Sequence, residues 1–453
     1  MRTQTSPPGT SWTRKRLGEW LPIRYGKARS VAHGYVREDT PVYGSSGEIG
    51  RYTRALTSGP SLIVGRKGNV GAAHYSSEPC WPIDTVFYAE EPPGKDLRLF
   101  KYLLDFLQLV SLDRSTAVPG LRRNDYNEIE VALPESAEEQ HRIVEEIEKQ
   151  LTRLDAGVAA LKRVQANLRR YRAAVLKAAC EGRLVPTEAE LARQESRPYE
   201  PASILVTRIK ADRANVAPAN RRGSQRESVA TFPVGLSPLP EGWAWTTVGQ
   251  IAEVVRGASP RPAGDPRFFG GGIPWITVGP ITADNDPFLW AVPATVTPAG
   301  RKRSRYVEAG TLLLTNSGAT LGVPKITLIG GCINDGVAAL LGLDHPLKLF
   351  LLYYLRSLTE RLRGINQGAA QPNLNTTIIK AIGAPLPPLS EQHRIVAEVE
   401  RHLSLADGLE RIVTANLHRA TRLRQSVLQA AFSGSLVPNA AKAGAKWSGE
   451  EGS

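Results

Sequence analysis

The sequence is poor in cysteine and has no long apolar run. Its 453 residues include three cysteines, Cys80, Cys180 and Cys332, without the spacing of zinc ligands or of a disulfide framework. No apolar run approaches the roughly 20 residues that cross a bilayer, and Met1–Gly9 contains no hydrophobic signal region. We therefore expect free thiols, no metal site, no membrane segment and a location in the cytoplasm.

Motifs for catalysis are also lacking. There is no Walker loop and no His-Glu-x-x-His helix, and the seven histidines do not cluster. Residues 265–272 resemble a glycine-rich S-adenosylmethionine loop, and Asp286-Pro287-Phe288 resembles an incomplete adenine methyltransferase box. Such a cofactor loop follows a strand and opens a helix. Here a Pro/Arg stretch precedes residues 265–272 and a predicted strand, Ile273–Val278, follows. We expect both stretches to be surface loops, and we expect no catalytic residue.

Negative charge is the minority among the charged residues. The 57 Lys and Arg outnumber the 44 Asp and Glu, which gives a formal net charge of +13. This balance favours a polyanionic partner, because Lys and Arg that neutralise phosphates release condensed counterions. An ordinary basic protein would look the same by charge alone.

An internal repeat organises the chain. The run Glu139-Gln140-His141-Arg142-Ile143-Val144 recurs unchanged 252 positions later as Glu391-Gln392-His393-Arg394-Ile395-Val396. The same offset relates Gly182 to Gly434. We interpret this as a tandem duplication.

Both copies of the repeat are predicted to form long helices. Apolar residues recur in alternating three- and four-residue steps, interrupted in the first copy by Gln165 and Arg172 and in the second by Glu410 and Arg424. Such a stripe predicts pairing with another helix. Gly182 and Gly434 lie where a helix would end.

The predicted fold class is α+β, with two mixed α/β globules alternating with two long helices that pair as an antiparallel coiled coil about a pseudo-two-fold axis. The predicted domains are a first globule (1–138), a first helix (139–182), a linker with a short helix (183–238), a second globule (239–390), a second helix (391–435) and a disordered tail (436–453).

The ordered motifs resemble the specificity subunits of type I restriction–modification systems. The resemblance rests on residues 41–50, 65–71 and 81–85 in the first globule, on 239–245 and 273–276 in the second, and on 385–396 at the second helix. It covers Trp12 to Pro438. The stretch before the first helix, Leu133–Ser136, lacks the proline cluster of the second copy.

The resemblance implies that each globule is a target-recognition domain that reads half of an interrupted double-stranded DNA sequence. It also implies that the helices set the gap and dock two methyltransferase subunits, and that separate restriction subunits complete a nuclease. S-adenosylmethionine, ATP and magnesium would then belong to those partners, and this bacterial or archaeal chain would have no active site.

Candidate DNA contacts are polar and basic residues in predicted loops, because such side chains reach phosphates and base edges. In the first globule they are Tyr43, Ser45, Ser46, Arg66, Lys67, Asn69, Arg122, Arg123 and Asn124. In the second they are Arg301, Lys302, Arg303, Arg305, Asn316, Ser317, Gln371, Asn373 and Asn375. Partner docking is expected at the helix starts, through Glu139, Gln140, Arg142, Ile143, Glu391, Gln392, Arg394 and Ile395.

Two other functions stay open from the sequence. The chain could be a self-contained DNA adenine methyltransferase, or a non-specific scaffold that bridges DNA. The missing cofactor loop argues against the first, and the divergence of the two globules argues against the second, because a scaffold would suit identical heads.

Overall fold

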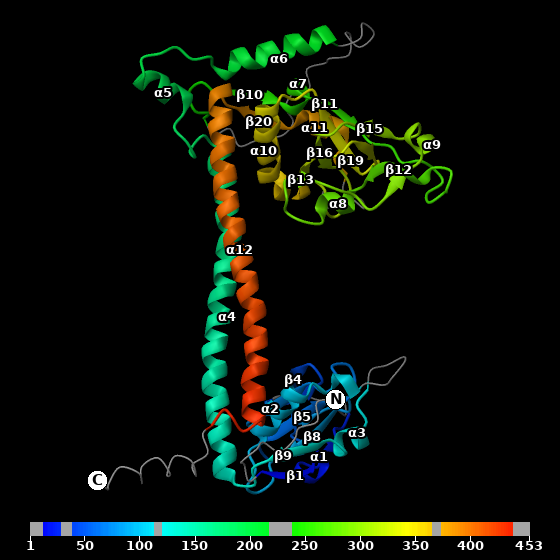
Figure 1. Cartoon of the computed structure of the whole chain (residues 1–453), viewed down its shortest axis with the longest axis vertical. Helices are drawn as coiled ribbons and strands as arrows, with labels where there is room; N and C mark the ends of the chain where they lie inside the picture. Colours follow the sequence, from blue (N-terminus) through cyan, green and yellow to red (C-terminus); the bar gives the residue numbers. More distant parts are fainter. Residues whose placement is uncertain (1–11, 29–38, 113–119, 217–237, 365–372, 438–453) are drawn as a thin grey trace, which may run out of the picture. The chain divides into compact units, whose positions relative to one another are not determined.

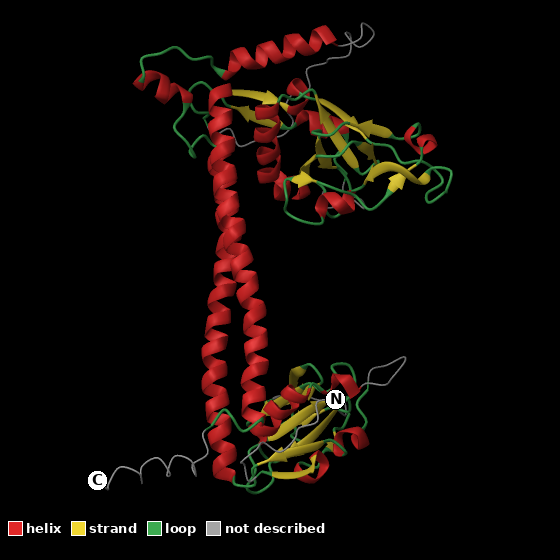
Figure 2. Cartoon of the chain, in the orientation of Figure 1, coloured by secondary structure: helices red, strands yellow, loops and turns green. Residues whose placement is uncertain are grey.

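The computed structural model describes residues 12–28, 39–112, 120–216, 238–364 and 373–437. The chain divides into two compact units. Unit 1 comprises Met1–Val164 and Ile412–Ser453, and unit 2 comprises Gln165–Arg411. Each unit contains a mixed α/β globule together with part of each of two long helices (Figures 1 and 2). The mixed α/β class and the long helices confirm the predicted fold class.

Globule 1, in the described part of residues 12–136, is built on two small sheets and a strand pair. One sheet has the order β2-β8-β5-β6 and the other has the order β4-β3-β7. Helix α2 packs on β5 and β6. The elements are β1 (Thr13–Arg16), α1 (Leu17–Trp20), β2 (Arg24–Tyr25), β3 (Thr40–Gly44), β4 (Gly47–Tyr52), β5 (Ser61–Gly65), β6 (Ala73–Ser76), β7 (Trp81–Pro82), β8 (Val86–Glu90), α2 (Leu97–Leu107), the 3-10 helix η1 (Leu109–Leu112), α3 (Arg123–Asn127) and β9 (Glu130–Leu133).

Globule 2, in the described part of residues 238–388, follows the same plan with one more strand in each of the two sheets. Its sheets have the orders β11-β19-β16-β17-β13 and β14-β12-β18-β15. The elements are β10 (Ala244–Thr247), α7 (Val248–Ile251), β11 (Glu253–Arg256), β12 (Phe269–Ile276), α8 (Val278–Thr282), β13 (Phe288–Leu289), β14 (Thr295–Val296), α9 (Pro298–Arg301), β15 (Arg305–Val307), β16 (Leu312–Thr315), β17 (Pro324–Thr327), β18 (Gly331–Ile333), β19 (Val337–Leu341), α10 (His345–Gly364), α11 (Thr376–Ala381) and β20 (Gly383–Leu386).

The linker between the first helix and globule 2 contributes α5 (Glu188–Gln194) and α6 (Ala202–Val216). Ala202, Leu205 and Val206 of α6 join the hydrophobic core of globule 2. The linker is therefore partly packed within unit 2.

The glycine-rich stretch at 269–272 is not the expected surface loop, because it opens strand β12. Gly270 has a φ of +83°, and the pairing with β14 shifts in register between Phe269 and Ile273. Glycine tolerates this bulged backbone, which a residue with a Cβ atom would strain. A strand at this place also removes the strand–loop–helix setting that a cofactor loop requires.

The two long helices, α4 (Ala137–Cys180) and α12 (Leu389–Phe432), have 44 residues each. Gly182 and Gly434 follow them with φ values of +66° and +70°. The amide of Arg183 donates to the Ala178 carbonyl at 2.9 Å, and the amide of Ser435 donates to the Ala430 carbonyl at 3.0 Å. Both helices thus end in the same way, on a left-handed glycine.

Within each unit, α4 and α12 pair antiparallel. In unit 2, Arg172 binds Asp407 at 2.5 Å and Glu410 at 2.6 Å, although Arg172 lies late in α4 and Asp407 lies early in α12. In unit 1, Arg424 late in α12 binds Asp155 early in α4. Arg424 and Asp407 lie 252 positions after Arg172 and Asp155, so each unit holds one copy of the same ion pair. The charged interruptions of the apolar stripe are therefore cross-helix contacts.

None of the helices in the described ranges combines the length and the apolar character needed to cross a bilayer. Within the same ranges, no group of three or more His, Cys, Asp or Glu side chains could hold a metal ion.

Candidate nucleic-acid interface

In globule 1, the loop between β5 and β6 gathers several of the predicted contacts. Gly68 and Gly71 take φ values of +80° and +74°, which fold the loop back on itself. Lys67 forms a β-bridge with Gly120. The amide of Asn69 donates to Ser45 Oγ at 3.4 Å. Three segments far apart in sequence therefore meet at this loop.

The loop between β16 and β17 repeats the arrangement in globule 2. Gly318 and Gly322 have φ values of +82° and +80°. Ser317 forms a β-bridge with Asn373, as Lys67 does with Gly120. This second loop is one residue longer than the first.

Backbone hydrogen bonds place Arg66 and Asn316 at equivalent positions. The Arg66 amide donates to Thr85 O at 3.0 Å, and the Asn316 amide donates to Gly336 O at 2.9 Å. The Arg66 carbonyl accepts from the Leu121 amide at 2.9 Å, and the Asn316 carbonyl accepts from the Leu374 amide at 2.7 Å. The two loops share one backbone frame.

The side chains on this shared frame differ. Lys67 and Asn69 are exposed, whereas Ser317 is half-buried and Thr320 is exposed. Asn316 is fully buried, and neither polar atom of its amide has a hydrogen-bond partner. Its side chain faces the interior, so in this conformation it lies behind the loop surface.

The remaining candidates of globule 1 lie around this loop. Ser46 is exposed in the β3–β4 turn, and Tyr43 is half-buried, with burial raising the pKa of its hydroxyl. Arg122 precedes α3, and Arg123 and Asn124 begin it; all three are exposed.

The basic cluster of globule 2 lies on α9 and β15. The guanidinium groups of Arg301 and Arg303 cover the rings of Tyr306 and Phe268, with their central carbons 3.9 and 4.4 Å from the ring centroids. Arg305 Nε donates to the Arg256 carbonyl at 3.0 Å, which links the cluster to β11. Lys302 is exposed beside them.

Two candidates of globule 2 remain. Asn375 caps α11 by accepting from the Ile378 amide at 2.8 Å, so its side chain has a structural task. Gln371 lies outside the described residues.

The start of each long helix is fastened to its own globule by the same contacts. Trp12 Nε1 donates to Glu139 Oε1, and Trp243 Nε1 donates to Glu391 Oε1, both at 2.9 Å. Gln140 donates to Pro134 O at 2.8 Å, as the equivalent Gln392 does to Pro387 O at 2.9 Å.

These contacts use most of the predicted docking residues within the unit. Ile143, Gln392 and Ile395 are buried, and Arg394 pairs with Glu188 at 2.7 Å. Arg142 is exposed. Burial also raises the pKa of Glu391, although the hydrogen bonds from the Glu188 amide and from Trp243 oppose that shift.

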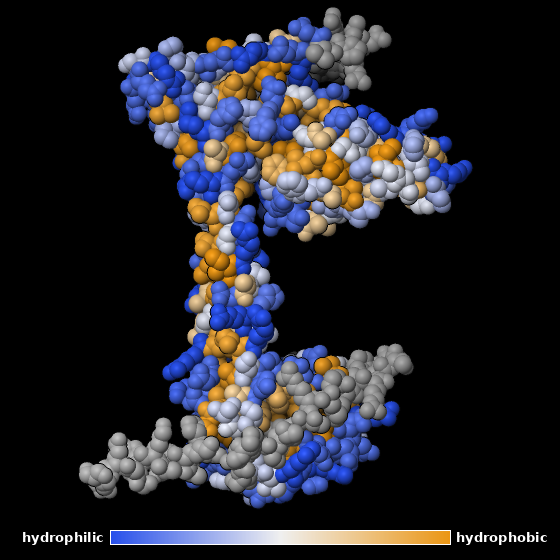
Figure 3. Space-filling view, in the orientation of Figure 1, coloured by the Kyte–Doolittle hydropathy of each residue, from blue (hydrophilic) through white to orange (hydrophobic). Residues whose placement is uncertain are grey.

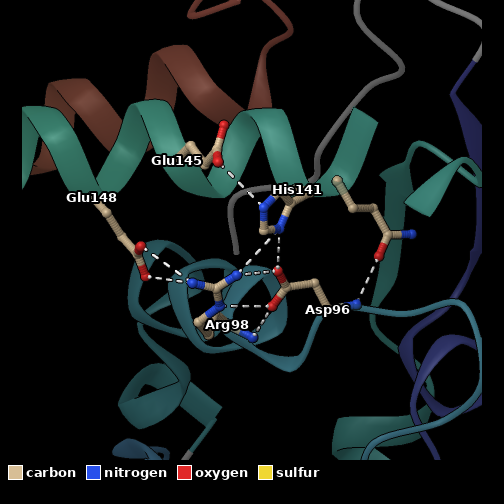
Figure 4. A network of polar contacts seen from close by, with 6 residues as sticks. Asp96, Arg98, His141, Glu145 and Glu148 are labelled. Atoms are coloured by element: carbon tan, nitrogen blue, oxygen red, sulfur yellow. Dashed lines mark hydrogen bonds and ion pairs between the residues drawn. The ribbon is translucent and has the colours of Figure 1, made fainter. Parts of the chain in front are cut away.

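A charge network ties α2 to the start of α4 (Figure 4). Asp96 caps α2 and binds Arg98 at 2.8 Å, and Arg98 reaches Glu148 at 3.3 Å. His141 lies between Asp96, at 3.5 Å, and Glu145, at 3.2 Å. Burial raises the pKa of Asp96, but the hydrogen bonds and charge of Arg98 outweigh burial, and the net shift is downward.

The duplication seen in the fold also appears when the sequence is compared with known families. The sequence model of the family described as "Type I restriction modification DNA specificity domain" matches residues 10–166 and again residues 240–415. The chain therefore belongs to this family, which confirms the resemblance found in the sequence. The class is that of the specificity subunits of type I restriction–modification systems, which recognise DNA sequence and are non-catalytic.

Individual relatives agree with this class. The chain is similar to the type I restriction enzyme EcoBI specificity subunit of Escherichia coli, with 26% identity over 390 residues, 83% of this chain and 73% of that protein. It is also 26% identical to the EcoDI specificity subunit of Escherichia coli over 329 residues, 72% of this chain but only 66% of that protein.

A solved structure has a similar fold. A chain from a study of complex assembly and conformational transition of the type I R-M system superposes with a TM-score of 0.62 at 20% identity, covering 95% of this chain and 99% of that one.

Proposed function

We propose that this chain reads an interrupted double-stranded DNA sequence, one half through each globule, and catalyses no reaction itself. The observation that carries this proposal is the pair of equivalent loops, 66–71 and 316–322, with one backbone frame and different side chains. Equal frames suit two segments of the same polymer, and unequal side chains suit two different base sequences.

The paired helices are the proposed spacer and docking surface. Figure 3 shows apolar patches along the helices. Exposed apolar residues there are Leu405 and Leu409 in unit 2 and Ile412 and Leu423 in unit 1. Exposed apolar stripes of this kind mark protein interaction sites. Two methyltransferase subunits are the proposed occupants, because the duplication gives each unit its own copy of the helix start and of the cross-helix ion pair.

Restriction subunits complete the proposed assembly, which acts on DNA in the cytoplasm of a bacterium or archaeon. S-adenosylmethionine, ATP and magnesium are assigned to the partner subunits.

The spacer is tested by lengthening both helices together. An insertion in α4 alone, between Asp155 and Arg172, would shift one cross-helix ion pair out of register with the other. We therefore place four residues after Ala160 in α4 and four after Arg419 in α12, which keeps both ion pairs. The helix pair gains about 6 Å, close to two base pairs at about 3.4 Å each.

The readout is the set of methylated sites, mapped by sequencing DNA from cells that express each variant with the methyltransferase subunit. We expect the two half-sequences to stay the same and the gap to grow by one or two base pairs. As a control, four residues inserted into the polar linker at 217–237 should change neither. Altered half-sequences with an unchanged gap would refute the spacer role.

A further inference from the structure

Each globule holds a guanidinium group against the same turn. The turn precedes β8 in globule 1 and β19 in globule 2, where Val86 and Val337 occupy equivalent positions opposite Gly65 and Thr315. Two residues earlier stand Asp84 and Asp335. Arg66 Nη2 donates to the Asp84 carbonyl at 2.8 Å. In globule 2, Arg256 Nε donates to the Asp335 carbonyl at 2.7 Å.

The two arginines come from different positions in the fold. Arg66 follows β5, and its equivalent in globule 2 is Asn316, which has no charge. Arg256 ends β11 opposite Ala338, and its equivalent in globule 1 is Tyr25, which pairs with Phe87. Both turns therefore have a positive charge, but residues at different positions of the fold supply it.

Both guanidinium groups keep donors for a ligand. Within the described ranges, neither Arg66 nor Arg256 forms an ion pair with a carboxylate. Arg66 lies over the ring of Tyr25 at 5.4 Å. Its Nε has no hydrogen-bond partner but is buried, so the donors left for a ligand are those of the two Nη groups. Arg256 is exposed. A guanidinium has five N–H donors, and the turn carbonyl accepts from only one of its nitrogens.

The loop next to this guanidinium group has different side chains in the two globules. Its frame is fixed by equivalent hydrogen bonds, but its outer residues are Lys67-Gly68-Asn69 in one globule and Ser317-Gly318-Ala319-Thr320 in the other. A contact with a phosphate carries no sequence information, whereas a contact with a base edge does. Constant charge at the turn therefore fits a phosphate, and variable side chains at the loop fit bases.

We propose that the turn and loop of each globule form a two-part reading head. Arg66 and Arg256 bind a backbone phosphate of the half-site, and residues 67–69 and 317–320 read its bases. This inference rests on the proposed function, because it assigns parts within the same DNA-binding surface.

The phosphate contact is tested with the full-length chain and duplex DNA that carries its target. Arg66→Asn gives globule 1 the neutral residue of globule 2, and we expect roughly 10-fold weaker binding to target and non-target duplexes alike. The slope of log K against log salt should fall in magnitude by about 0.9. Arg14→Asn is the matched control, because Arg14 is exposed but paired with Glu130 at 2.5 Å, and it should leave the slope unchanged.

A rescue distinguishes this role from mere support of the turn. The double variant Tyr25→Arg with Arg66→Asn transfers the arrangement of globule 2 into globule 1. We expect it to regain most of the affinity and of the salt slope. Retained weakness in a folded double variant, or unchanged binding by Arg66→Asn, would overturn the phosphate contact.

The base contact is tested by replacing residues 67–69 with Ser-Gly-Ala-Thr, the sequence of 317–320. Selection from a random duplex library should yield a new first half-sequence, with the second half-sequence and the gap unchanged. The intact second half-sequence also shows that the chain is folded. An unchanged first half-sequence would overturn the reading head alone. A wild-type chain, assembled with its methyltransferase subunit, that selects no sequence would refute the proposed function itself.

Discussion

The two tryptophan–glutamate contacts at the helix starts should differ in strength although their geometry is the same. Trp12→Phe and Trp243→Phe each remove one indole N–H that donates to a carboxylate at 2.9 Å. Both tryptophans are similarly buried, at 7% and 8% exposure, so the loss of ring area is about equal. The acceptors differ, because Glu391 is fully buried and Glu139 is only half-buried.

The burial of the acceptor sets the expected magnitude. Water can replace the lost donor at Glu139, which limits the cost of its hydrogen bond to about 0.5–1 kcal/mol. At Glu391 the carboxylate keeps the Glu188 amide at 2.8 Å but is shielded from water. Loss of a hydrogen bond to a buried charged group costs about 1.5–3 kcal/mol. Trp243→Phe should therefore cost about 1–2 kcal/mol more than Trp12→Phe.

Hydrogen exchange measured by mass spectrometry reports both sites in one experiment. A local measurement is needed because a chain with two compact units need not unfold in one step. Peptides covering 389–400 should lose more protection in Trp243→Phe than peptides covering 137–148 lose in Trp12→Phe. Equal losses, or a larger loss in Trp12→Phe, would refute the argument from burial.

Three further predictions concern the network at α2 and the helix pair. Asp96 has a pKa below its ordinary 3.8, so its contribution to stability is present above that pH and is lost as the pH falls through the lowered pKa. In an acid titration followed by circular dichroism, Asp96→Asn should abolish this loss. Arg172→Glu should destabilise the helix pair by about 1 kcal/mol, and adding Asp407→Arg should restore hydrogen-exchange protection at 165–180. Phe432→Ala should lower the free energy of opening at 97–107 by about 3–5 kcal/mol, measured by hydrogen exchange, because Phe432 is buried against Phe106.

The long helices could be predicted because their signals are local. The heptad stripe and the glycines at 182 and 434 lie within the helices or directly after them, and the duplication shows each signal twice. The ion-pair partners of the charged residues that interrupt the stripe could also be predicted. Asp155 and Asp407 share the 252-residue offset with Arg172 and Arg424, and an antiparallel pair brings each arginine to the aspartate of the other copy.

The proposed DNA-binding surface was harder to predict, because side chains from distant segments form it. The residues around Asn316 in the sequence predict an exposed loop, yet the Asn316 side chain is fully buried in the fold. The proposed phosphate contact Arg256 was not predicted, because a single arginine at the end of a strand carries no signal like that of the basic cluster at 301–305. Trp12, Gly18 and Gly26 match Trp243, Gly249 and Gly257 in spacing, and that alignment places Tyr25 opposite Arg256. The sequence does not indicate that in globule 1 the guanidinium group at the turn comes from Arg66, 41 positions after Tyr25.

The first and last strands of each globule lie side by side. Strand β1 pairs with β9, with Thr13 opposite Leu133, and β10 pairs with β20, with Ala244 opposite Leu386. The chain therefore enters and leaves a globule through two neighbouring strand ends. A whole globule could be exchanged for another provided that those two junctions match, because the exchange would change neither the length nor the direction of the helices. Genetic recombination at two short matching stretches would then suffice to give the chain a new globule.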